Sequence, residues 1–276
     1  MKRVKDFYNN HGIREWHRLN KDAHSRLNLA LHQKFLLPHI GKAKKVLDAG
    51  CGSGRFSVFI AESGSEITLL DISEKQIEIA RYQLERSRVE QKVDRYIVAD
   101  ILNLKEISNE IFDTTVCFGG VLNYLGSSLQ KGLRELKRVT KKGGVLVLSV
   151  NSLYGGLFRY IIANEHSIES KLFQNSDSNF WKDIIQTGNL LEISGHPERH
   201  FFTSKEIEQI LIKEGFSNIT FASSPSISFG LYDQLNRFEE SESKWDLVLS
   251  LEESLFDQPE LINVGEFLLI KCIKTQ

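Results

Sequence analysis

The stretch Val46-Leu47-Asp48-Ala49-Gly50-Cys51-Gly52-Ser53-Gly54-Arg55-Phe56 is an apolar run that leads into a turn with three glycines and then into a helical pattern. Glycine suits a turn whose backbone needs unusual dihedral angles and which a ligand must approach without hindrance from Cβ atoms. The N-terminus of the following helix offers free N–H groups to an anion. An ordinary strand-to-helix turn can also hold spare glycines, so the turn predicts a binding site only together with further observations.

The chain around this turn alternates between short apolar runs and amphipathic segments. The runs typical of buried strands are KKVLDAG (44–50), EITLLDI (66–72), DRYIVADI (94–101), FDTTVCFGG (112–120) and GGVLVLSV (143–150), and the helical patterns between them cover 54–63, 74–89 and 127–140. A later helix capped by Thr203 and ended by Gly215, a strand at Ser217–Ala222 and a last strand at Glu266–Lys274 bring the count to seven strands. This alternation predicts parallel βαβ units with helices on both faces of one sheet.

Two carboxylates at strand ends accompany the turn. Asp71 closes the second predicted strand, about twenty residues beyond the turn, where an acidic side chain can bind ribose hydroxyls. Asp100 closes the third strand at the same edge of the sheet. A single aspartate at a strand end is more often a helix cap or a turn residue, but three in succession with Asp48 favour a nucleotide-like ligand.

The glycine spacing distinguishes between two classes of nucleotide-binding turn. The dinucleotide pattern G-x-G-x-x-G needs a third glycine at position 55, where this chain has Arg55, and its third glycine is Gly54. The pattern D-x-G-x-G-x-G therefore resembles that of the class I S-adenosylmethionine-dependent methyltransferases. The resemblance covers residues 44–150, and 201–224 and 266–274 agree with it. It implies a Rossmann-like α/β fold with a mostly parallel seven-stranded sheet, whose last strand is inserted antiparallel between the fifth and sixth.

The resemblance also implies where S-adenosylmethionine, and its product S-adenosylhomocysteine, would bind. Asp48 would lie near the methionine amino group. Gly50, Cys51, Gly52 and Gly54 would wrap the amino-acid part of the cofactor.

The nucleoside part would lie along the next strand ends. Asp71 would hold the ribose hydroxyls, with Ile72 against the adenine. Asp100 would accept a hydrogen bond from the adenine amino group, with Ile101 beside it. Phe118 and Gly119 would form the floor under the sulfonium.

The chain divides into four segments by pattern. We expect an N-terminal helical lid at 1–43, the cofactor-binding core at 44–150, a cap insertion at 151–200, and the end of the core at 201–276 with a second insertion at 225–262. The aromatic and aliphatic residues of the insertions predict either a partly apolar acceptor cavity or the cap's own core. The insertions are also a candidate homodimer interface.

The lid segment contains Tyr8, Trp16 and Arg26, in an arrangement similar to the N-terminal lid of many small-molecule methyltransferases. There an aromatic residue or an arginine touches the methionine end of the cofactor. Packing of Tyr8 and Trp16 against the sheet is an equally good interpretation.

Candidates for the acceptor side are weaker. Asn123 and Tyr124 follow the fourth strand and either line the pocket or serve in capping and packing. His196 and His200 are the candidate general bases, although a histidine in a loop is more often a solvated residue. A base is needed for a phenol, alcohol or ammonium acceptor, but not for a neutral amine or a thiolate.

Composition narrows the class of protein. The 276 residues carry 35 Lys+Arg against 36 Asp+Glu, so the overall charge does not favour nucleic acid or an anionic membrane surface as partner. Three scattered cysteines predict a reducing, cytoplasmic setting and no zinc site, and no apolar run has the length of a membrane span. We therefore expect a methyltransferase acting on an O or N atom of a small molecule. The alternatives are a methyltransferase acting on tRNA or protein and a non-catalytic S-adenosylmethionine-binding module.

Overall fold

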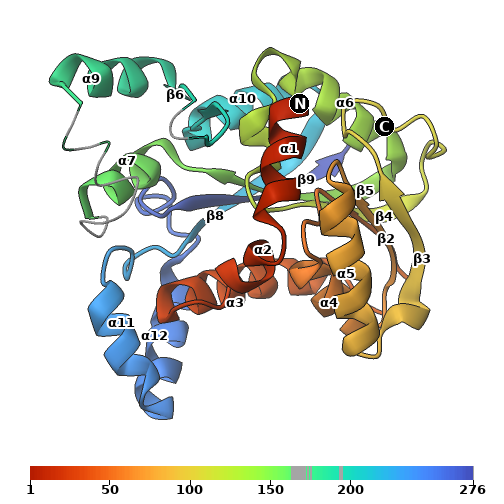
Figure 1. Cartoon of the computed structure of the whole chain (residues 1–276), viewed down its shortest axis with the longest axis horizontal. Coiled ribbons are helices and arrows are strands. Elements are labelled where there is room, and N and C mark those ends of the chain that lie inside the picture. The colour runs from red at the N-terminus through yellow and green to blue at the C-terminus, as the bar shows by residue number, and fades with distance from the viewer. Residues whose placement is uncertain (163–171, 173, 175, 193–194, 276) are drawn as a thin grey trace.

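A seven-stranded sheet forms the centre of the computed structural model, which describes residues 1–162, 172, 174, 176–192 and 195–275 (Figure 1). Its strands are β1 (Lys45–Ala49), β2 (Glu66–Asp71), β3 (Val93–Val98), β4 (Phe112–Cys117), β5 (Thr140–Asn151), β8 (Phe216–Ser224) and β9 (Phe267–Lys274), in the order β3-β2-β1-β4-β5-β9-β8. The pairs among β1 to β5 are parallel, and β9 is antiparallel to both β5 and β8. The predicted Rossmann-like sheet, with its last strand inserted antiparallel, is confirmed.

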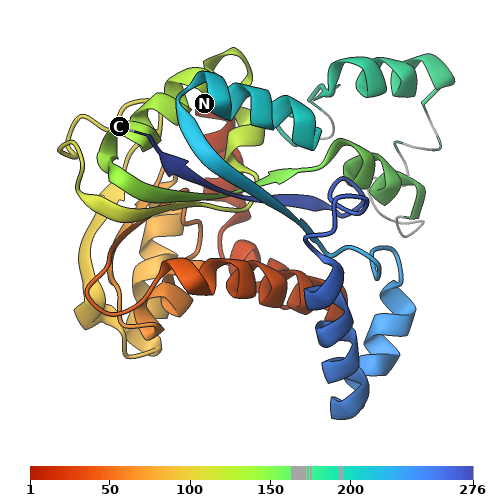
Figure 2. The same ribbon diagram turned by 180° about the vertical axis from the view of Figure 1, so that it is seen from behind.

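Helices cover both faces of this sheet (Figure 2). One face carries α3 (Ala23–Leu36), α4 (Arg55–Glu62) and α5 (Glu74–Arg86), and the other carries α6 (Leu129–Val139) and α10 (Ser204–Lys213). The other helices are α1 (Lys2–His11), α2 (Arg14–Arg18), α7 (Leu153–Ile162), α9 (Ser178–Thr187), α11 (Tyr232–Glu239) and α12 (Glu242–Leu255), with short 3-10 helices η1 (Leu37–His39), η2 (Glu90–Lys92), η3 (Val121–Tyr124) and η4 (Gly126–Ser128). None of the helices among the described residues is long and apolar enough to cross a bilayer.

The apolar strand runs are explained by burial on both faces. Val46 packs into the cluster beneath α4 and α5, whereas its neighbour Leu47 packs into the cluster beneath α6 and α10. Because successive side chains of a strand point to opposite faces, a sheet covered on both sides needs apolar residues at both positions. This is why the strands could be found from sequence without an alternating pattern.

The insertion after β5 contains structure that the sequence did not reveal. A two-stranded antiparallel sheet joins β6 (Asn189–Leu190) to β7 (Arg199–His200). Strands of two residues are too short for any periodicity, so no sheet was expected there. The described helices of this insertion are α7 and α9, and residues 163–171, with 173, 175 and 193–194, lie outside the described residues.

The second insertion is a helical hairpin, α11–α12, which packs on α3 (Figure 2). Leu235 is fully buried there against Leu27 and Leu31, and Trp245 packs on the same cluster. The aromatic and aliphatic residues of this hairpin thus form a core with α3.

Candidate active site

A cavity of about 850 Å³, counted with its open mouth, lies where the strand order reverses between β1 and β4. Loops leaving these neighbouring strands diverge, which opens a crevice at the carboxyl ends of the strands. We name it the turn cavity. Its lining includes ten of the eleven residues predicted to hold the cofactor: Asp48, Gly50, Cys51, Gly52, Asp71, Ile72, Asp100, Ile101, Phe118 and Gly119.

The turn after β1 is held tightly against β2. The backbone N–H groups of Gly50 and Cys51 both donate to the Leu70 carbonyl oxygen, at 2.7 and 2.9 Å. Gly50 has φ +79°, and a Cβ atom on it would lie 2.4 Å from Cγ2 of Val121. Only glycine therefore fits at this position without displacing the neighbouring loop.

Gly54 is the predicted cofactor residue that does not line the turn cavity. It has φ +85°, and a Cβ atom on it would lie 2.9 Å from Cβ of Ala80 in α5. The glycine thus allows α4 to approach α5 closely. Its place in the motif reflects helix packing in this structure.

The strand-end carboxylates are buried. Asp48 accepts a hydrogen bond from the Ser57 hydroxyl at 2.6 Å, and burial raises its pKa to about 7. Asp71 accepts from the backbone N–H of Gly52 and of Ser73, each at 2.8 Å, and burial raises its pKa to about 6. Among the described residues, neither carboxylate forms an ion pair with a Lys, Arg or His side chain, so both lack a cationic partner.

This donor set fits the amino-acid and ribose parts of S-adenosylmethionine. A ligand ammonium would supply the cation that Asp48 lacks, and ribose hydroxyls would donate to Asp71. Asp100 is half-buried in the same wall and accepts from the Leu102 N–H at 2.9 Å through one oxygen. Across the described residues, no group of three or more His, Cys, Asp or Glu side chains could hold a metal ion.

Helix α1, near the N-terminus of the chain, contributes Val4 and Tyr8 to the lining of the turn cavity. The Gln76 side-chain amide donates to the carbonyl oxygens of Tyr8 and Gly12, at 3.0 and 3.1 Å, which ties the end of α1 to α5. The Tyr8 side chain lines the cavity, and its hydroxyl lies 3.3 Å from that of Tyr124. Burial raises the pKa of Tyr8, so its phenol stays protonated near neutral pH.

The cavity also contains an ion pair that sequence reasoning missed. Arg18 donates to the Glu15 carboxylate at 2.7 to 3.0 Å, and both residues line the turn cavity. Their spacing of three residues signals a helix-surface pair, but nothing local signals a cavity wall. Their position depends on how α2 folds back over the sheet.

Two residues of the predicted lid have other partners. Trp16 does not line the turn cavity, since its ring lies beneath the Arg55 guanidinium, 3.6 Å from Cζ to the ring centroid. Arg55 does line the cavity, so Trp16 acts as its support. Arg26 pairs with Glu239 of α11 and does not line the turn cavity, whereas Arg18 and Arg55 do.

A second cavity, of about 880 Å³ with its open mouth, lies between α1, α7 and the loop before β7, and we name it the cap cavity. It shares a wall with the turn cavity, formed by Tyr8, Glu15, Arg18, Gly119 and Tyr124. The predicted base candidate His196 lines the cap cavity, with its ring 4.9 Å from that of Phe7. Two binding spaces therefore meet across a few side chains.

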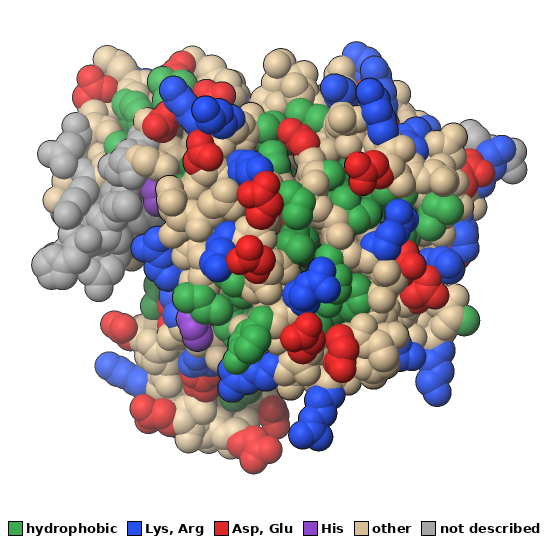
Figure 3. Space-filling model, turned by 45° about the vertical axis from the view of Figure 1, so that its right-hand side comes forward, with side chains coloured by type: hydrophobic (Ala, Val, Ile, Leu, Met, Phe, Trp, Pro, Cys, Tyr) green, Lys and Arg blue, Asp and Glu red, His purple; other side chains and the backbone are tan. Residues whose placement is uncertain are grey.

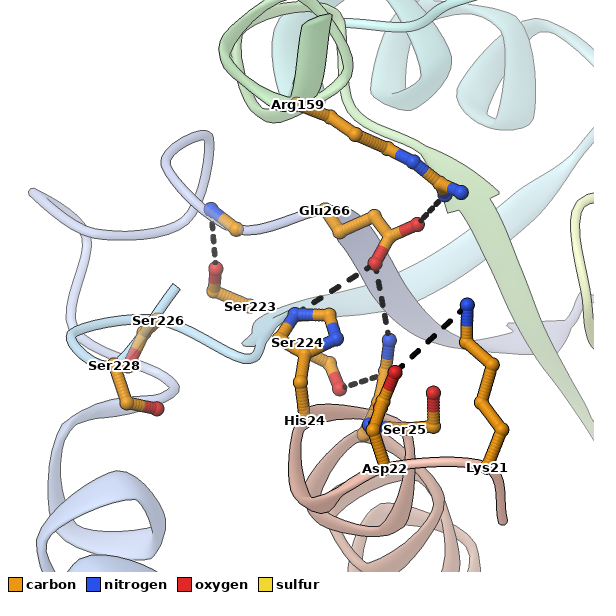
Figure 4. Close-up of polar contacts among 12 residues, drawn as sticks. Lys21, Asp22, His24, Ser25, Arg159, Ser223, Ser224, Ser226, Ser228 and Glu266 are labelled. Carbon is orange, nitrogen blue, oxygen red and sulfur yellow. Dashed lines mark hydrogen bonds and ion pairs between the residues drawn. The ribbon is translucent and has the colours of Figure 1, made fainter. Parts of the chain in front are cut away.

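One side of the cap cavity is an ionic network (Figure 4). Arg159 reaches from α7 to the buried Glu266, which directly precedes β9, and the two form an ion pair. The other carboxylate oxygen of Glu266 lies 3.9 Å from Nε2 of His24, in α3. The Arg159 charge lowers the pKa of Glu266 against the opposing effect of burial, so this carboxylate is ionised at neutral pH.

Asn123 and His200 line neither of these two cavities and face a third, outer one. The Asn123 amide donates to the His200 carbonyl oxygen and accepts from the Asn151 N–H at 3.1 Å. The His200 ring nitrogens lie 2.8 Å from the Asn189 side-chain oxygen and 2.7 Å from a Glu206 carboxylate oxygen. These contacts join β7 to its neighbours and occupy both nitrogens of the imidazole.

The molecular surface has mixed charge on the face drawn in Figure 3. Acidic and basic side chains are interspersed there, and hydrophobic side chains gather in a stripe through the middle of the view. This agrees with the near-zero formal net charge of −1.

A family model described as "Methyltransferase domain" matches residues 40–215, which contain the glycine turn and five of the seven sheet strands. The chain belongs to the methyltransferase-domain family. This confirms the resemblance to class I S-adenosylmethionine-dependent methyltransferases drawn from the D-x-G-x-G-x-G motif. The matched range also includes the first insertion, whereas β8, β9 and the α11–α12 hairpin lie beyond it.

Individual relatives of this methyltransferase-domain chain are more distant. Malonyl-[acyl-carrier protein] O-methyltransferase from Erwinia pyrifoliae is 40% identical over 116 residues, 41% of this chain and 40% of that protein. In three relatives of that name, the match spans 38% to 49% of their length.

Solved structures agree in fold. The Burkholderia thailandensis 1,6-didemethyltoxoflavin-N1-methyltransferase, with bound S-adenosylhomocysteine, has a TM-score of 0.56 at 17% identity, over 90% of this chain and 79% of that one. Phosphoethanolamine N-methyltransferase 2 from Haemonchus contortus has a TM-score of 0.57 at 17% identity, over 90% of this chain and 52% of that one.

Proposed function

We propose that this chain transfers a methyl group from S-adenosylmethionine to an oxygen or nitrogen atom of a small molecule. The observation that carries the proposal is the shared wall between the turn cavity and the cap cavity. Two cavities that meet at Tyr8, Gly119 and Tyr124 suit an enzyme that aligns two bound reactants. The curated and solved relatives include both O- and N-methyltransferases, so the atom methylated stays open between these two.

In this proposal the turn cavity holds the methyl donor. Asp48 binds the ammonium of the methionine part, Asp71 binds the ribose hydroxyls, and Asp100 faces the adenine amino group. S-adenosylmethionine supplies a sulfonium methyl, and the sulfur becomes a neutral thioether that needs no proton. The chain's own task is therefore to hold the two reactants in line and to exclude water.

The segment 1–43 serves as the lid in this proposal. Its α1 covers the turn cavity through Val4 and Tyr8, and α2 adds Glu15 and Arg18. Residues 44–150, with 201–224 and 266–274, form the cofactor-binding core. The insertion at 151–200 contributes the outer part of the acceptor site.

The acceptor binds in the cap cavity, where His196 is the base candidate for an alcohol or phenol. The presence of this second cavity favours turnover over a binding module closed to any acceptor. The mixed charge of the face drawn in Figure 3 and the formal net charge of −1 favour a small acceptor over tRNA, and the three free, buried cysteines suit a reducing cytoplasm. A homodimer through the insertions stays a prediction.

Calorimetric titration and a transfer assay test this function together. S-adenosylhomocysteine should bind at one site per chain, and radiolabelled methyl from S-adenosylmethionine should appear in a small-molecule fraction incubated with the protein. Absence of binding would remove the proposal. Binding without transfer to any small molecule, protein or RNA would support the non-catalytic alternative instead.

A further inference from the structure

Arg199 of β7 lines the cap cavity and has no carboxylate paired with it among the residues that the structure describes. Its Nη2 donates a hydrogen bond to the Tyr160 hydroxyl oxygen at 3.0 Å, and its guanidinium carbon lies 5.3 Å from the centroid of the Phe201 ring. Its Nε is buried and has no hydrogen-bond partner within the described part of the chain. A buried donor left without an acceptor is costly, which points to a ligand that supplies one.

The other two arginines of the cap cavity are neutralised by neighbours. Arg18 is paired with Glu15, and Arg159 is paired with Glu266. No carboxylate among the described residues forms an ion pair with Arg199. Counted over the described part of the chain alone, the arginines and glutamates that line the cavity sum to one positive charge.

We propose that the acceptor molecule carries one carboxylate group, and that Arg199 binds this carboxylate while Tyr160 holds the guanidinium in place. The proposal rests on the function proposed above and specifies its substrate class. A planar guanidinium pairs with a carboxylate through two parallel hydrogen bonds. One negative charge balances the described arginines and glutamates of the cavity, whereas a phosphate dianion would leave an excess negative charge close to Glu15 and Glu266.

The lining around Arg199 defines the rest of the acceptor. Phe7, Leu190, Pro197 and Phe267 present apolar surface to the cap cavity. A ligand that fits is thus an apolar or aromatic acid, held by its carboxylate at Arg199. Since Arg199 lines the cap cavity but not the turn cavity, the carboxylate is a binding handle and the methylated atom lies elsewhere on the molecule, toward the wall formed by Tyr8, Gly119 and Tyr124.

Binding of three matched probes to the protein saturated with S-adenosylhomocysteine tests this inference. The probes are phenylacetate, its uncharged amide phenylacetamide, and phenyl phosphate, each titrated by calorimetry. Phenylacetate should bind about tenfold or more tighter than phenylacetamide, and more tightly than phenyl phosphate. Arg199→Gln should abolish the preference for the acid over the amide, and Arg199→Lys should keep part of it because the charge remains.

A matched control is Arg237→Gln, since Arg237 is exposed on α11 and lines none of the three cavities described above. It should leave all three affinities unchanged. Equal binding of acid and amide, tighter binding of phenyl phosphate, failure of all three probes to bind, or a preference that survives Arg199→Gln would overturn the inference. The affinity for S-adenosylhomocysteine is measured in the same samples. If the wild-type protein does not bind S-adenosylhomocysteine, both the proposed function and the acceptor class are contradicted. If it binds S-adenosylhomocysteine but shows no preference for the acid, only the acceptor class is contradicted.

Discussion

The turn cavity and the cap cavity are built in opposite ways. The turn cavity comes mostly from one continuous segment, and its key features are backbone features: positive φ at Gly50 and Gly52, and carboxylates at successive strand ends. The cap cavity is assembled from residues as distant in sequence as Phe7, Tyr160 and Glu266, through their side chains. The difference teaches that the methyl-donor half of the site is encoded locally, while the acceptor half depends on how separate segments come together.

The largest effect is expected from Gly50→Ala, which breaks the local half. The new side chain adopts a left-handed φ that costs about 1–2 kcal/mol, and its Cβ meets Val121 at 2.4 Å, which adds about 1–3 kcal/mol. Affinity for S-adenosylhomocysteine should fall about a hundredfold or more, as measured by calorimetry. Gly143→Ala is the matched control, since Gly143 has φ +70° but an added Cβ would have no atom within 4 Å. Equal losses in the two variants would show that backbone strain alone is responsible.

The second-largest effect is expected from substitution of Asp71, the aspartate at the end of β2. Asp71→Ala should weaken cofactor binding by about 1–3 kcal/mol, because it deletes a charge-assisted hydrogen bond to hydroxyls and the acceptor that fixes the Gly52 N–H. Asp71→Asn, which keeps the shape, separates the charge from the geometry. An unchanged dissociation constant for Asp71→Ala would mean that the ribose lies elsewhere.

A pH dependence of stability follows from Asp48. In the unfolded chain an aspartate loses its proton near about pH 4, whereas in the fold Asp48 keeps it to about pH 7. Between these values the native state binds more protons than the unfolded state, in which the aspartate is already ionised, so stability falls as pH rises. Asp48→Asn should therefore gain stability relative to the wild type over this range, on the order of 2 kcal/mol by urea unfolding without ligand. A difference that shrinks or stays constant with rising pH would contradict the burial of an uncompensated carboxyl group.

The smallest effect is expected from His200→Asn, on the cap side but outside both cavities. Its imidazole joins Asn189 to Glu206, so kcat/KM should stay within about threefold of the wild type, whereas loss of a general base costs about a hundredfold or more. His196→Asn is the comparison within the cap cavity. A drop of the larger size in His200→Asn would place the chemistry at the outer cavity.

The contrast between the two cavities also explains how much of the fold and of the site could be predicted from sequence. Buried strands can be recognised because a sheet covered on both sides favours apolar residues on both faces of each strand, as at Val46 and Leu47. Ten of the eleven expected cofactor residues line the turn cavity because strand ends and a glycine turn are local features. Gly54 differs because a motif glycine can serve packing against Ala80 as well as ligand approach.

The acceptor side was mostly beyond sequence reasoning. The Glu15–Arg18 pair lines both cavities only because α2 lies against the core, and Arg199 stands on a two-residue strand with no periodicity. Of the residues predicted from sequence, Tyr8, Tyr124 and His196 line the cap cavity, whereas the polar groups of His200 and Asn123 are engaged in holding β7. Side chains brought together by long-range folding leave no spacing rule to read.

A crystal structure of the protein with S-adenosylhomocysteine tests the central claim most directly. We expect the homocysteine part to lie against Gly50 and Gly52, the ribose hydroxyls to bind Asp71, and the sulfur to face the wall shared with the cap cavity. A ligand bound outside the turn cavity, or a sulfur directed away from that wall, would contradict it.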